Sequence, residues 1–279
     1  MLKPSLSHRR LCLVLLDLIG STAFVEKAGP MRAARWLQYH DRLTRSLIRR
    51  FKGREIDRSD GFLISFELPV NAVNFALHYQ MTVPLQTKLK ARIGLHLGDV
   101  VEVKQHELDR LQGTKPIELE GVSKNIAARI MALCAADQVL MSQEAFRAIR
   151  NKTNYETPRG VRYAQVGLYK FKGVRSPVVV YAVGLKTATL QPPLDNAKAR
   201  RLGGPKKVRS HLRHMRFFER VAWALYRLAL LSVMYISAVF LAWASRPEAQ
   251  RLWGFDHWPW SILPLFRRFF SVIFGFEDG

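Results

Sequence analysis

The chain has 279 residues, 48% of them hydrophobic and 11% aromatic, so it can bury one core of ordinary domain size with roughly a hundred residues left over. Its 44 lysines and arginines against 22 acidic residues give a formal charge of +22. That charge predicts an anionic partner, such as nucleotide phosphates, nucleic acid or an acidic membrane surface. Only Cys12 and Cys134 are present, both in apolar sequence, so a disulfide framework or a zinc site has no support.

The first residues predict a strand that ends in a carboxylate. Residues 11–16 are continuously apolar and lead directly into Asp17, as in a buried strand with an acid at its C-terminal end. The acid interrupts the apolar run and no small-residue cleavage site follows, so this segment is interpreted as a strand and not as a signal peptide. Gly20, Ser21 and Thr22 come next, where the amides of a helix N-terminus could receive phosphate oxygens.

The elements after this strand alternate between helical and extended patterns. Apolar residues recur at helical spacing over residues 33–51, with arginines mostly outside the stripe. Segments 54–58 and 62–67 resemble a hairpin, with Asp60 in the Ser59-Asp60-Gly61 turn signal. Further helices are expected at 70–81, 122–135 and 143–149, and strands at 91–103, 138–141, 163–171 and 177–183, with a solvated loop over 104–115. This order favours an α+β fold with a ferredoxin-like core over a doubly wound parallel sheet.

The C-terminal third has a different composition. Residues 186–220 are rich in Pro, Gly and basic side chains and are expected to form a linker. Residues 221–244 are apolar, apart from Arg227, over a length that can cross a hydrocarbon layer of ~30 Å, so a transmembrane helix is expected there. A buried or amphipathic partner helix is the alternative. Residues 246–279 form an aromatic tail expected at the membrane interface, and the basic flank before residue 221 predicts an inner-membrane protein whose main domain, residues 1–185, is cytoplasmic.

Two carboxylates, Asp17 and Asp60, would lie side by side if their segments were neighbouring strands. Such a pair suits Mg²⁺, which usually binds through one or two carboxylates plus substrate phosphates. Two-metal displacement sites hold their ions ~3.5–4 Å apart. Taken singly, an acid at a strand end is more often a turn former or a helix cap, so the pattern as a whole has to carry the interpretation.

The ordered set of motifs resembles the class III adenylyl and guanylyl cyclases. The matching segments are LLDLIGST at 15–22, DGFLISF at 60–66, RIGLHLGDV at 92–100, GVSKNIAARI at 121–130 and FKG at 171–173, and they cover about residues 10–185. The resemblance implies a ferredoxin-like cyclase domain with a mixed, mainly antiparallel sheet and flanking helices. It also implies conversion of a nucleoside triphosphate into a 3′,5′-cyclic nucleotide and pyrophosphate, with two Mg²⁺ or Mn²⁺ ions per site.

The resemblance also implies a role for each matching residue. Asn125 would orient the ribose, Arg129 would stabilise charge on the α-phosphate, and Lys172 would meet the leaving pyrophosphate. The metal ions would be held by Asp17, Asp60 and the backbone carbonyl of Leu18, and the triphosphate by the amides of Gly20, Ser21 and Thr22. In the family the metal ligands and the Asn/Arg pair come from opposite chains, so the resemblance implies an antiparallel homodimer with two equivalent sites.

The base-reading positions depart from the family pattern. Family members usually have Lys and Asp where this chain has Ile56 and Glu118. Ile56 cannot hydrogen-bond a base edge, whereas Glu118 can accept a hydrogen bond from an exocyclic amine, which adenine and cytosine carry. ATP is therefore the first expectation and CTP a competitor, as in the pyrimidine cyclases of phage defence.

Two other functions remain as alternatives. A catalytically silent cyclase-like module could bind a nucleotide or a partner, and the loss of a base reader at Ile56 favours it. A nucleic-acid binder using the basic residues 198–220 is the weaker alternative, because this run lacks interleaved aromatic residues and leads directly into the apolar segment. No specific nucleic-acid partner is therefore expected.

Overall fold

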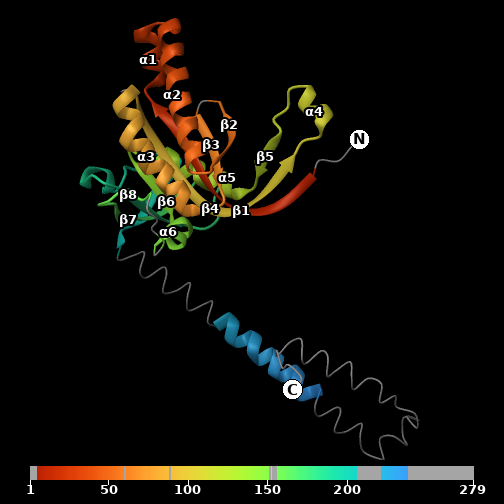
Figure 1. Ribbon diagram of the computed structural model, residues 1–279. Helices are drawn as coiled ribbons and strands as arrows, with labels where there is room; N and C mark the ends of the chain where they lie inside the picture. Colours follow the sequence, from red (N-terminus) through yellow and green to blue (C-terminus); the bar gives the residue numbers. More distant parts are fainter. Residues whose placement is uncertain are drawn as a thin grey trace, which may run out of the picture. The chain divides into compact units, whose positions relative to one another are not determined.

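The computed structural model describes residues 5–59, 61–87, 89–150, 152, 156–205 and 221–237 (Figure 1). The chain divides into two compact units, residues 1–212 and 213–279. The first unit contains all of the described strands. Its order of elements begins with strand β1, helices α1 and α2 and the hairpin β2–β3, and it ends with strand β9.

One sheet forms the centre of the first unit. Its two long strands, β1 (Ser5–Ile19) and β4 (Lys90–Lys104), pair antiparallel from Ser5 opposite Lys104 to Ile19 opposite Lys90. The sheet order is β2-β3-β1-β4-β6-β8-β7-β9, and β5 pairs with β4 away from this path. The other strands are β2 (Arg54–Arg58), β3 (Gly61–Phe66), β5 (Ile117–Glu120), β6 (Val139–Ser142), β7 (Arg162–Phe171), β8 (Val178–Gly184) and β9 (Ala199–Gly203). Only β4 and β6 are parallel among these pairs, so the predicted mixed, mainly antiparallel sheet is confirmed.

Helices cover both faces of this sheet, and the alternation of side chains along β1 shows which face is which. Cys12, Val14 and Leu16 pack in the largest core cluster, together with α3 (Pro69–Thr87) and α6 (Gln143–Ile149). Leu11 and Leu13 point the other way and pack with Ala127 of α5 (Val122–Leu133). Since side chains alternate along a strand, Asp17 shares the α5 face with Leu13.

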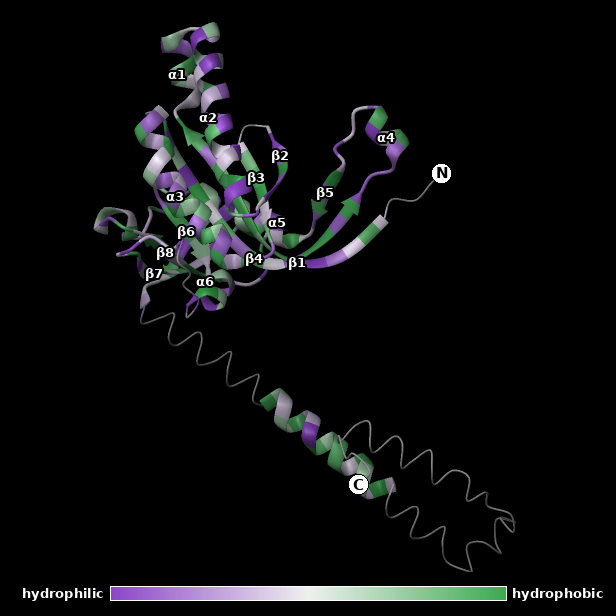
Figure 2. Ribbon diagram, viewed as in Figure 1, coloured by the Kyte–Doolittle hydropathy of each residue, from purple (hydrophilic) through white to green (hydrophobic). Residues whose placement is uncertain are grey.

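The amphipathic pattern predicted for residues 33–51 corresponds to helix α2 (Pro30–Arg50), which carries hydrophilic bands in Figure 2. The preceding helix α1 (Ser21–Ala28) is separate from it, because Gly29 at φ 77° and Pro30 interrupt the helical path.

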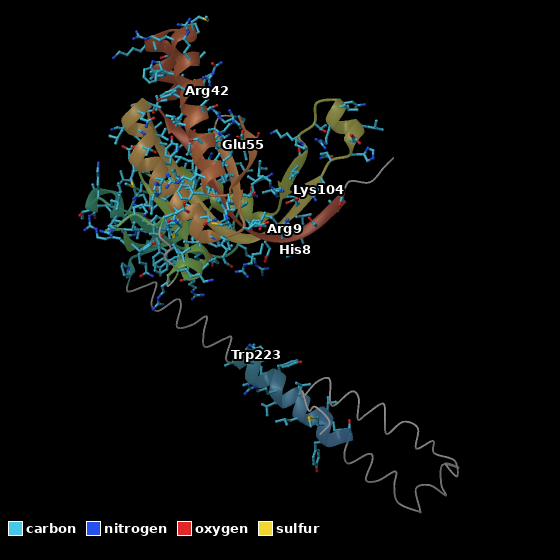
Figure 3. All side chains as sticks on the ribbon, viewed as in Figure 1. His8, Arg9, Arg42, Glu55, Lys104 and Trp223 are labelled. Atoms are coloured by element: carbon cyan, nitrogen blue, oxygen red, sulfur yellow. The ribbon has the colours of Figure 1, made fainter. Side chains whose placement is uncertain are left out.

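A part of the sheet extends beyond the helices as an arm, which we define as residues 5–10, 99–104 and 107–120. It contains α4 (Glu107–Leu111) and β5, both within or directly after the segment expected to be a solvated loop. Figure 3 labels His8, Arg9 and Lys104 on the strands of this arm. Leu6, Leu108 and Leu111 are exposed there, so the arm offers apolar as well as basic side chains for contact with another molecule.

The folded unit continues beyond residue 185 into the segment expected to be a linker. The short 3₁₀ helix η1 (Thr187–Leu190) follows β8, and β9 then pairs antiparallel with β7. This strand carries two arginines, but its Ala199 is buried in a core cluster and its Leu202 packs beside Leu168 and Val179, so it belongs to the folded unit.

The transmembrane helix predicted over residues 221–244 is wrong. Within the part of the chain that the structure describes, no helix has both the length and the apolar character needed to cross a membrane. Of the predicted segment, the structure describes residues 221–237, which are helical. The aromatic tail at 246–279 lies outside the described residues, and the inner-membrane location stays an untested prediction.

Candidate functional site

Asp17 lies near the C-terminal end of β1, on the face of the sheet that α5 covers. Opposite it on β4 stands Arg92, whose Nε and Nη2 donate hydrogen bonds of 2.9 and 2.6 Å to Asp17 Oδ2. No hydrogen bond from the described residues reaches Asp17 Oδ1. Arg92 was not predicted as a site residue, although it opens the family-like segment 92–100, because its contact with Asp17 depends on the strand register.

The second predicted metal ligand, Asp60, lies outside the described residues. Its neighbour Gly61 pairs with Asp17, so the two carboxylate-bearing segments are neighbouring strands as expected. A Cβ at Gly61 would lie 2.2 Å from the Leu16 carbonyl oxygen, a distance that no side chain tolerates. The start of β3 therefore has to be glycine for the hairpin to approach β1 this closely.

A buried polar network anchors the β2 side of this hairpin to α2. Arg58 donates from Nε and Nη2 to the two carboxylate oxygens of Asp41, both at 3.1 Å. His40, which is fully buried, lies with Nδ1 3.0 Å from Asp41 Oδ1 and Nε2 2.8 Å from the Tyr79 hydroxyl. Burial alone would raise the pKa of Asp41, but the hydrogen bonds from His40 and Arg58 hold it below its usual value.

The predicted phosphate-binding residues form the start of α1. Gly20 is its N-cap, with φ 73° and ψ 22°, and no side chain caps the helix. The amides of Ser21 and Thr22 belong to the first turn, where backbone N–H groups have no partner within the helix. This arrangement suits a phosphate, because the N–H groups and the positive end of the helix dipole both favour an anion.

The donors near Asp17 fit a hard divalent cation. Among the described residues, no group of three His, Cys, Asp or Glu side chains could hold a metal ion. A magnesium site of the substrate-assisted kind does not need three, since it takes one or two carboxylates and completes its shell with phosphates and water. Asp17 Oδ1, the backbone of Leu18 and Asp60 would be the protein ligands.

The other predicted catalytic residues gather around α5 and the turn after β7. Arg129 on α5 donates from Nε to the Lys172 carbonyl oxygen at 3.2 Å, which joins two sites 43 positions apart in sequence. Asn125 is exposed one turn earlier on the same helix. The Ser123 hydroxyl donates to the Asp99 carbonyl at 2.7 Å and so fixes the start of α5 on β4. The fold therefore brings Arg129 next to the Lys172 backbone, with Asn125 on the same helix as Arg129.

Lys172 lies far from Asp17 within one chain. It follows β7, which is separated from β1 by β4, β6 and β8, or about 19 Å at ~4.8 Å per strand. Helix α5 starts beside Asp99 and runs back along β4 until Met131 packs against Gly94. Asp17 and Lys172 therefore lie at separate places in one chain, with α5 between them.

The predicted base-reading residues share a small cavity. Ile56 on β2 and Glu118 on β5 both line a space of about 140 Å³, together with Lys115 and Lys124. The two lysines were not predicted for this role, although Lys124 lies in the family-like segment 121–130. Lys115 is held at 2.5 Å from Asp57 Oδ1, and Lys124 lies 3.3 Å from Glu120 Oε1. The cavity therefore combines three carboxylates, Asp57, Glu118 and Glu120, with two ammonium groups.

Three solved structures share this fold at low sequence identity. Adenylyl cyclase CyaB from P. aeruginosa is 17% identical, with a TM-score of 0.56 over 71% of this chain and 100% of that one. An adenylate cyclase from Trypanosoma brucei, solved in its monomeric state, is 22% identical, with a TM-score of 0.52 over 68% of this chain and 92% of the other. The guanylate cyclase domain of RhGC from Catenaria anguillulae in complex with GTP is 16% identical, with a TM-score of 0.52 over 63% and 97%.

Below 25% identity, these structures establish the fold alone. No curated protein sequence matches the chain significantly. The family model for the adenylate and guanylate cyclase catalytic domain, however, matches residues 4–183, which is more than half of the chain and nearly all of the sheet described above. The chain therefore belongs to the adenylate and guanylate cyclase catalytic-domain family.

Proposed function

We propose that this chain is an active nucleotidyl cyclase with ATP as its preferred substrate, and that it works as a homodimer. The observation that carries the proposal is the separation of Asp17 from Lys172 within one chain. Asp17 and the uncapped start of α1 form one half, which suits a metal-bound triphosphate. Arg129, Lys172 and Asn125 form the other, which suits the ribose and the charge that develops on phosphorus.

In the first half, Asp17 and Asp60 hold divalent ions that, when bound, lower the pKa of the ribose 3′-hydroxyl and neutralise phosphate charge. The amides of Ser21 and Thr22 receive phosphate oxygens at the helix N-terminus. Arg92, already fixed beside Asp17, presents its remaining N–H groups to the triphosphate. The pairing also balances the charge of Asp17 before substrate arrives.

In the second half, Asn125 orients the ribose so that its 3′-oxygen is in line with the α-phosphorus. The Arg129 guanidinium stabilises negative charge on the α-phosphate, and Lys172 receives the departing pyrophosphate. The hydrogen bond from Arg129 to the Lys172 backbone keeps one guanidinium face fixed, so the remaining donors are preorganised for the phosphate.

The separation of the two groups supports the homodimer, because a phosphate held near Asp17 is ~20 Å from Lys172 of the same chain. An isologous, two-fold pairing places the first half of one protomer against the second half of its partner and creates two equivalent sites. The exposed Leu6, Leu108 and Leu111 of the arm supply apolar contact for such a pairing.

Base choice rests on the cavity that Ile56 and Glu118 line. Glu118 accepts a hydrogen bond from an exocyclic amine, and Lys115 or Lys124 donates to the adjacent ring nitrogen in place of the lysine missing at Ile56. Adenine and cytosine both present this pattern, whereas guanine and uracil present a carbonyl oxygen where Glu118 would be repelled. CTP is therefore the competing substrate.

The deciding experiment offers the full chain each of ATP, GTP, CTP and UTP with Mg²⁺ or Mn²⁺ and identifies products by mass. We expect cyclic AMP as the main product and cyclic CMP as the next. Cyclic GMP or cyclic UMP as the main product would contradict the role proposed for Glu118 as an acceptor of an exocyclic amine. No cyclic product from any of the four would instead favour a silent nucleotide-binding module.

A further inference from the structure

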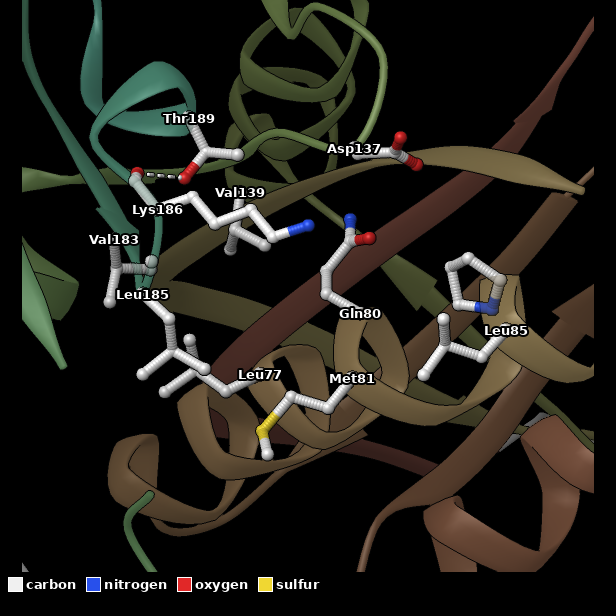
Figure 4. Close-up of a pocket in the computed structure, with 12 residues that line it drawn as sticks. Leu77, Gln80, Met81, Leu85, Asp137, Val139, Val183, Leu185, Lys186 and Thr189 are labelled. Atoms are coloured by element: carbon white, nitrogen blue, oxygen red, sulfur yellow. Dashed lines mark hydrogen bonds between the residues drawn. The ribbon is translucent and has the colours of Figure 1, made fainter. Parts of the chain in front are cut away.

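A second cavity lies on the opposite face of the sheet from Asp17. It has a volume of about 420 Å³, within the range of small-molecule sites, and it opens between α3, the turn before β6 and the segment after β8. Leu77, Met81 and Leu185 give it an apolar floor, as Figure 4 shows. Leu77 and Val183 belong to the core cluster that packs on α3, so the cavity is on the α3 face and not on the α5 face.

Buried polar groups face this apolar floor. Neither the Nε2 nor the Oε1 of Gln80 makes a hydrogen bond with any residue that the structure describes, and the same holds for Asp137 Oδ1. A buried donor or acceptor normally has a partner, so three such atoms lining one cavity indicate a place where a bound molecule completes the hydrogen bonding. In Figure 4 the side chain of Lys186 also extends into the cavity toward the Gln80 carboxamide.

The walls that hold these groups are themselves fixed. Asp137 takes a left-handed backbone conformation, φ 57°, and its N–H donates to the Ala91 carbonyl at 2.8 Å. The buried Gln138 donates from Nε2 to the carbonyls of Thr189 and Gln191, at 3.1 and 2.8 Å, and so ties the segment after β8 to the start of β6. The cavity is therefore preformed and does not depend on a mobile loop.

The charges around the cavity define the class of ligand. Asp137 is anionic and Lys186 is cationic, so a neutral ligand leaves their charges balanced. The Gln80 carboxamide offers one donor and one acceptor side by side, which a second amide or an amide-like ring edge matches with two hydrogen bonds. The apolar floor requires a hydrophobic body attached to that group.

We propose that this cavity is a binding site for a neutral small molecule that carries an amide, or an amide-like ring edge, on a flat apolar body. The amide pairs with Gln80, one further N–H donates to Asp137 Oδ1, and the apolar body lies on Leu77, Met81 and Leu185. The site is separate from the proposed catalytic residues. Its lining residue Asp137 is hydrogen-bonded to Ala91, the residue before Arg92, so the cavity is linked through one residue to the start of β4.

Benzamide is a suitable probe, with benzylamine and toluene as comparators of similar size. Saturation-transfer NMR and thermal shift on the full chain should show that benzamide binds more tightly than either, because benzylamine brings an unbalanced charge and toluene leaves Gln80 unpaired. Gln80→Leu should weaken benzamide binding by about tenfold or more while toluene binding is kept or improved. The matched control is Gln86→Leu, on the exposed side of the same helix, which should leave benzamide binding unchanged.

A labelling experiment gives an independent measurement if Gln80→Leu fails to fold. Met81→Cys places a thiol at the cavity in a chain whose own cysteines are buried. Benzamide should slow the reaction of this thiol with an iodoacetamide reagent, and toluene should slow it less. Absence of benzamide binding and protection, tighter binding of benzylamine, or equal benzamide affinity in Gln80→Leu would each overturn the proposal.

Discussion

Arg92 donates two hydrogen bonds to a single carboxylate oxygen of Asp17 and leaves the other oxygen without a hydrogen bond from the described residues. The two residues lie opposite each other on neighbouring central strands, and 33% of the Arg92 side chain and 21% of the Asp17 side chain are exposed. The guanidinium thus holds the carboxylate in place while one oxygen stays available for a cation. This arrangement leads to two separate predictions.

Asp17→Asn should abolish turnover while the protein stays folded. The substitution removes an anionic metal ligand with little change in volume. Activity with ATP and Mn²⁺ should be measured beside thermal melting, because loss of the Arg92 pair also removes a partly exposed interaction. Glu67→Gln is the control, since it neutralises an exposed carboxylate paired with Arg9. Wild-type activity in Asp17→Asn would mean that Asp17 does not hold the metal.

Arg92→Leu should strengthen the binding of Mn²⁺ in the absence of nucleotide, because a cation beside Asp17 no longer has to compete with a guanidinium. Electron paramagnetic resonance of free Mn²⁺ measures this directly, without any need for turnover. The same variant should show weaker ATP binding, since a phosphate-facing cation is lost. Unchanged Mn²⁺ affinity would show that Arg92 and the metal do not share the Asp17 carboxylate.

The base-reading cavity predicts a change in substrate preference. Glu118→Ala should lower kcat/KM for ATP and CTP by about tenfold or more, with a smaller effect on GTP, because only the first two bases donate an exocyclic amine to this acid. Ile56→Lys should raise the ratio of ATP to CTP turnover by restoring the family's usual donor. Equal losses for ATP and GTP in Glu118→Ala would indicate a structural role for the acid.

The network around Asp41 predicts a dependence of stability on pH. The pKa of Asp41 is lower in the folded protein than in the unfolded chain. Its contribution to stability is therefore complete above its unfolded pKa of ~3.9 and is lost as pH falls through the lower folded value. The melting temperature of the wild type should fall more steeply below about pH 5 than that of Asp41→Asn. Glu67→Gln removes an exposed carboxylate and is the control. Its melting temperature should fall with pH as steeply as that of the wild type.

Much of this fold could be predicted because its central elements carry a strong apolar signal. The run before Asp17 indicated the first strand, and the motif order indicated the family. Other elements carry no such signal. Helix α4 is five residues long, too short for a helical period to be visible, and β9 resembles a basic linker in sequence because only Ala199 and Leu202 supply its apolar contacts.

The residues of the candidate site also differ in how far the sequence alone could predict them. Asp17, Arg129 and Lys172 were named because the family resemblance assigns a role to each. Arg92 and Lys124 lie in family-like segments too, but their partners are recognised only once the fold brings them together. The transmembrane prediction rested on apolar composition alone, and among the described residues no helix is long and apolar enough to cross a membrane.

The last prediction tests whether each site is shared between protomers. Asp17→Ala and Arg129→Ala chains should each be inactive alone, because each lesion enters both sites of its own homodimer. In a mixed dimer one site receives both lesions and the other receives none, so one intact site remains. Random pairing makes about half of the dimers mixed, and co-expression should therefore restore roughly a quarter of wild-type activity if the two sites act independently.

Two different affinity tags allow the mixed dimers to be isolated, and these should reach about half of wild-type activity per dimer. The matched control co-expresses Asp17→Ala with Arg92→Leu, whose lesions fall in the same half of the site. That pair should not exceed the activity of its Arg92→Leu parent, because every site in its mixed dimer carries one of the two changes. Verified mixed dimers of Asp17→Ala and Arg129→Ala could instead be as inactive as their parents. In that case the two halves of the site do not meet across a dimer interface, and the roles proposed for Asn125 and Arg129 are wrong.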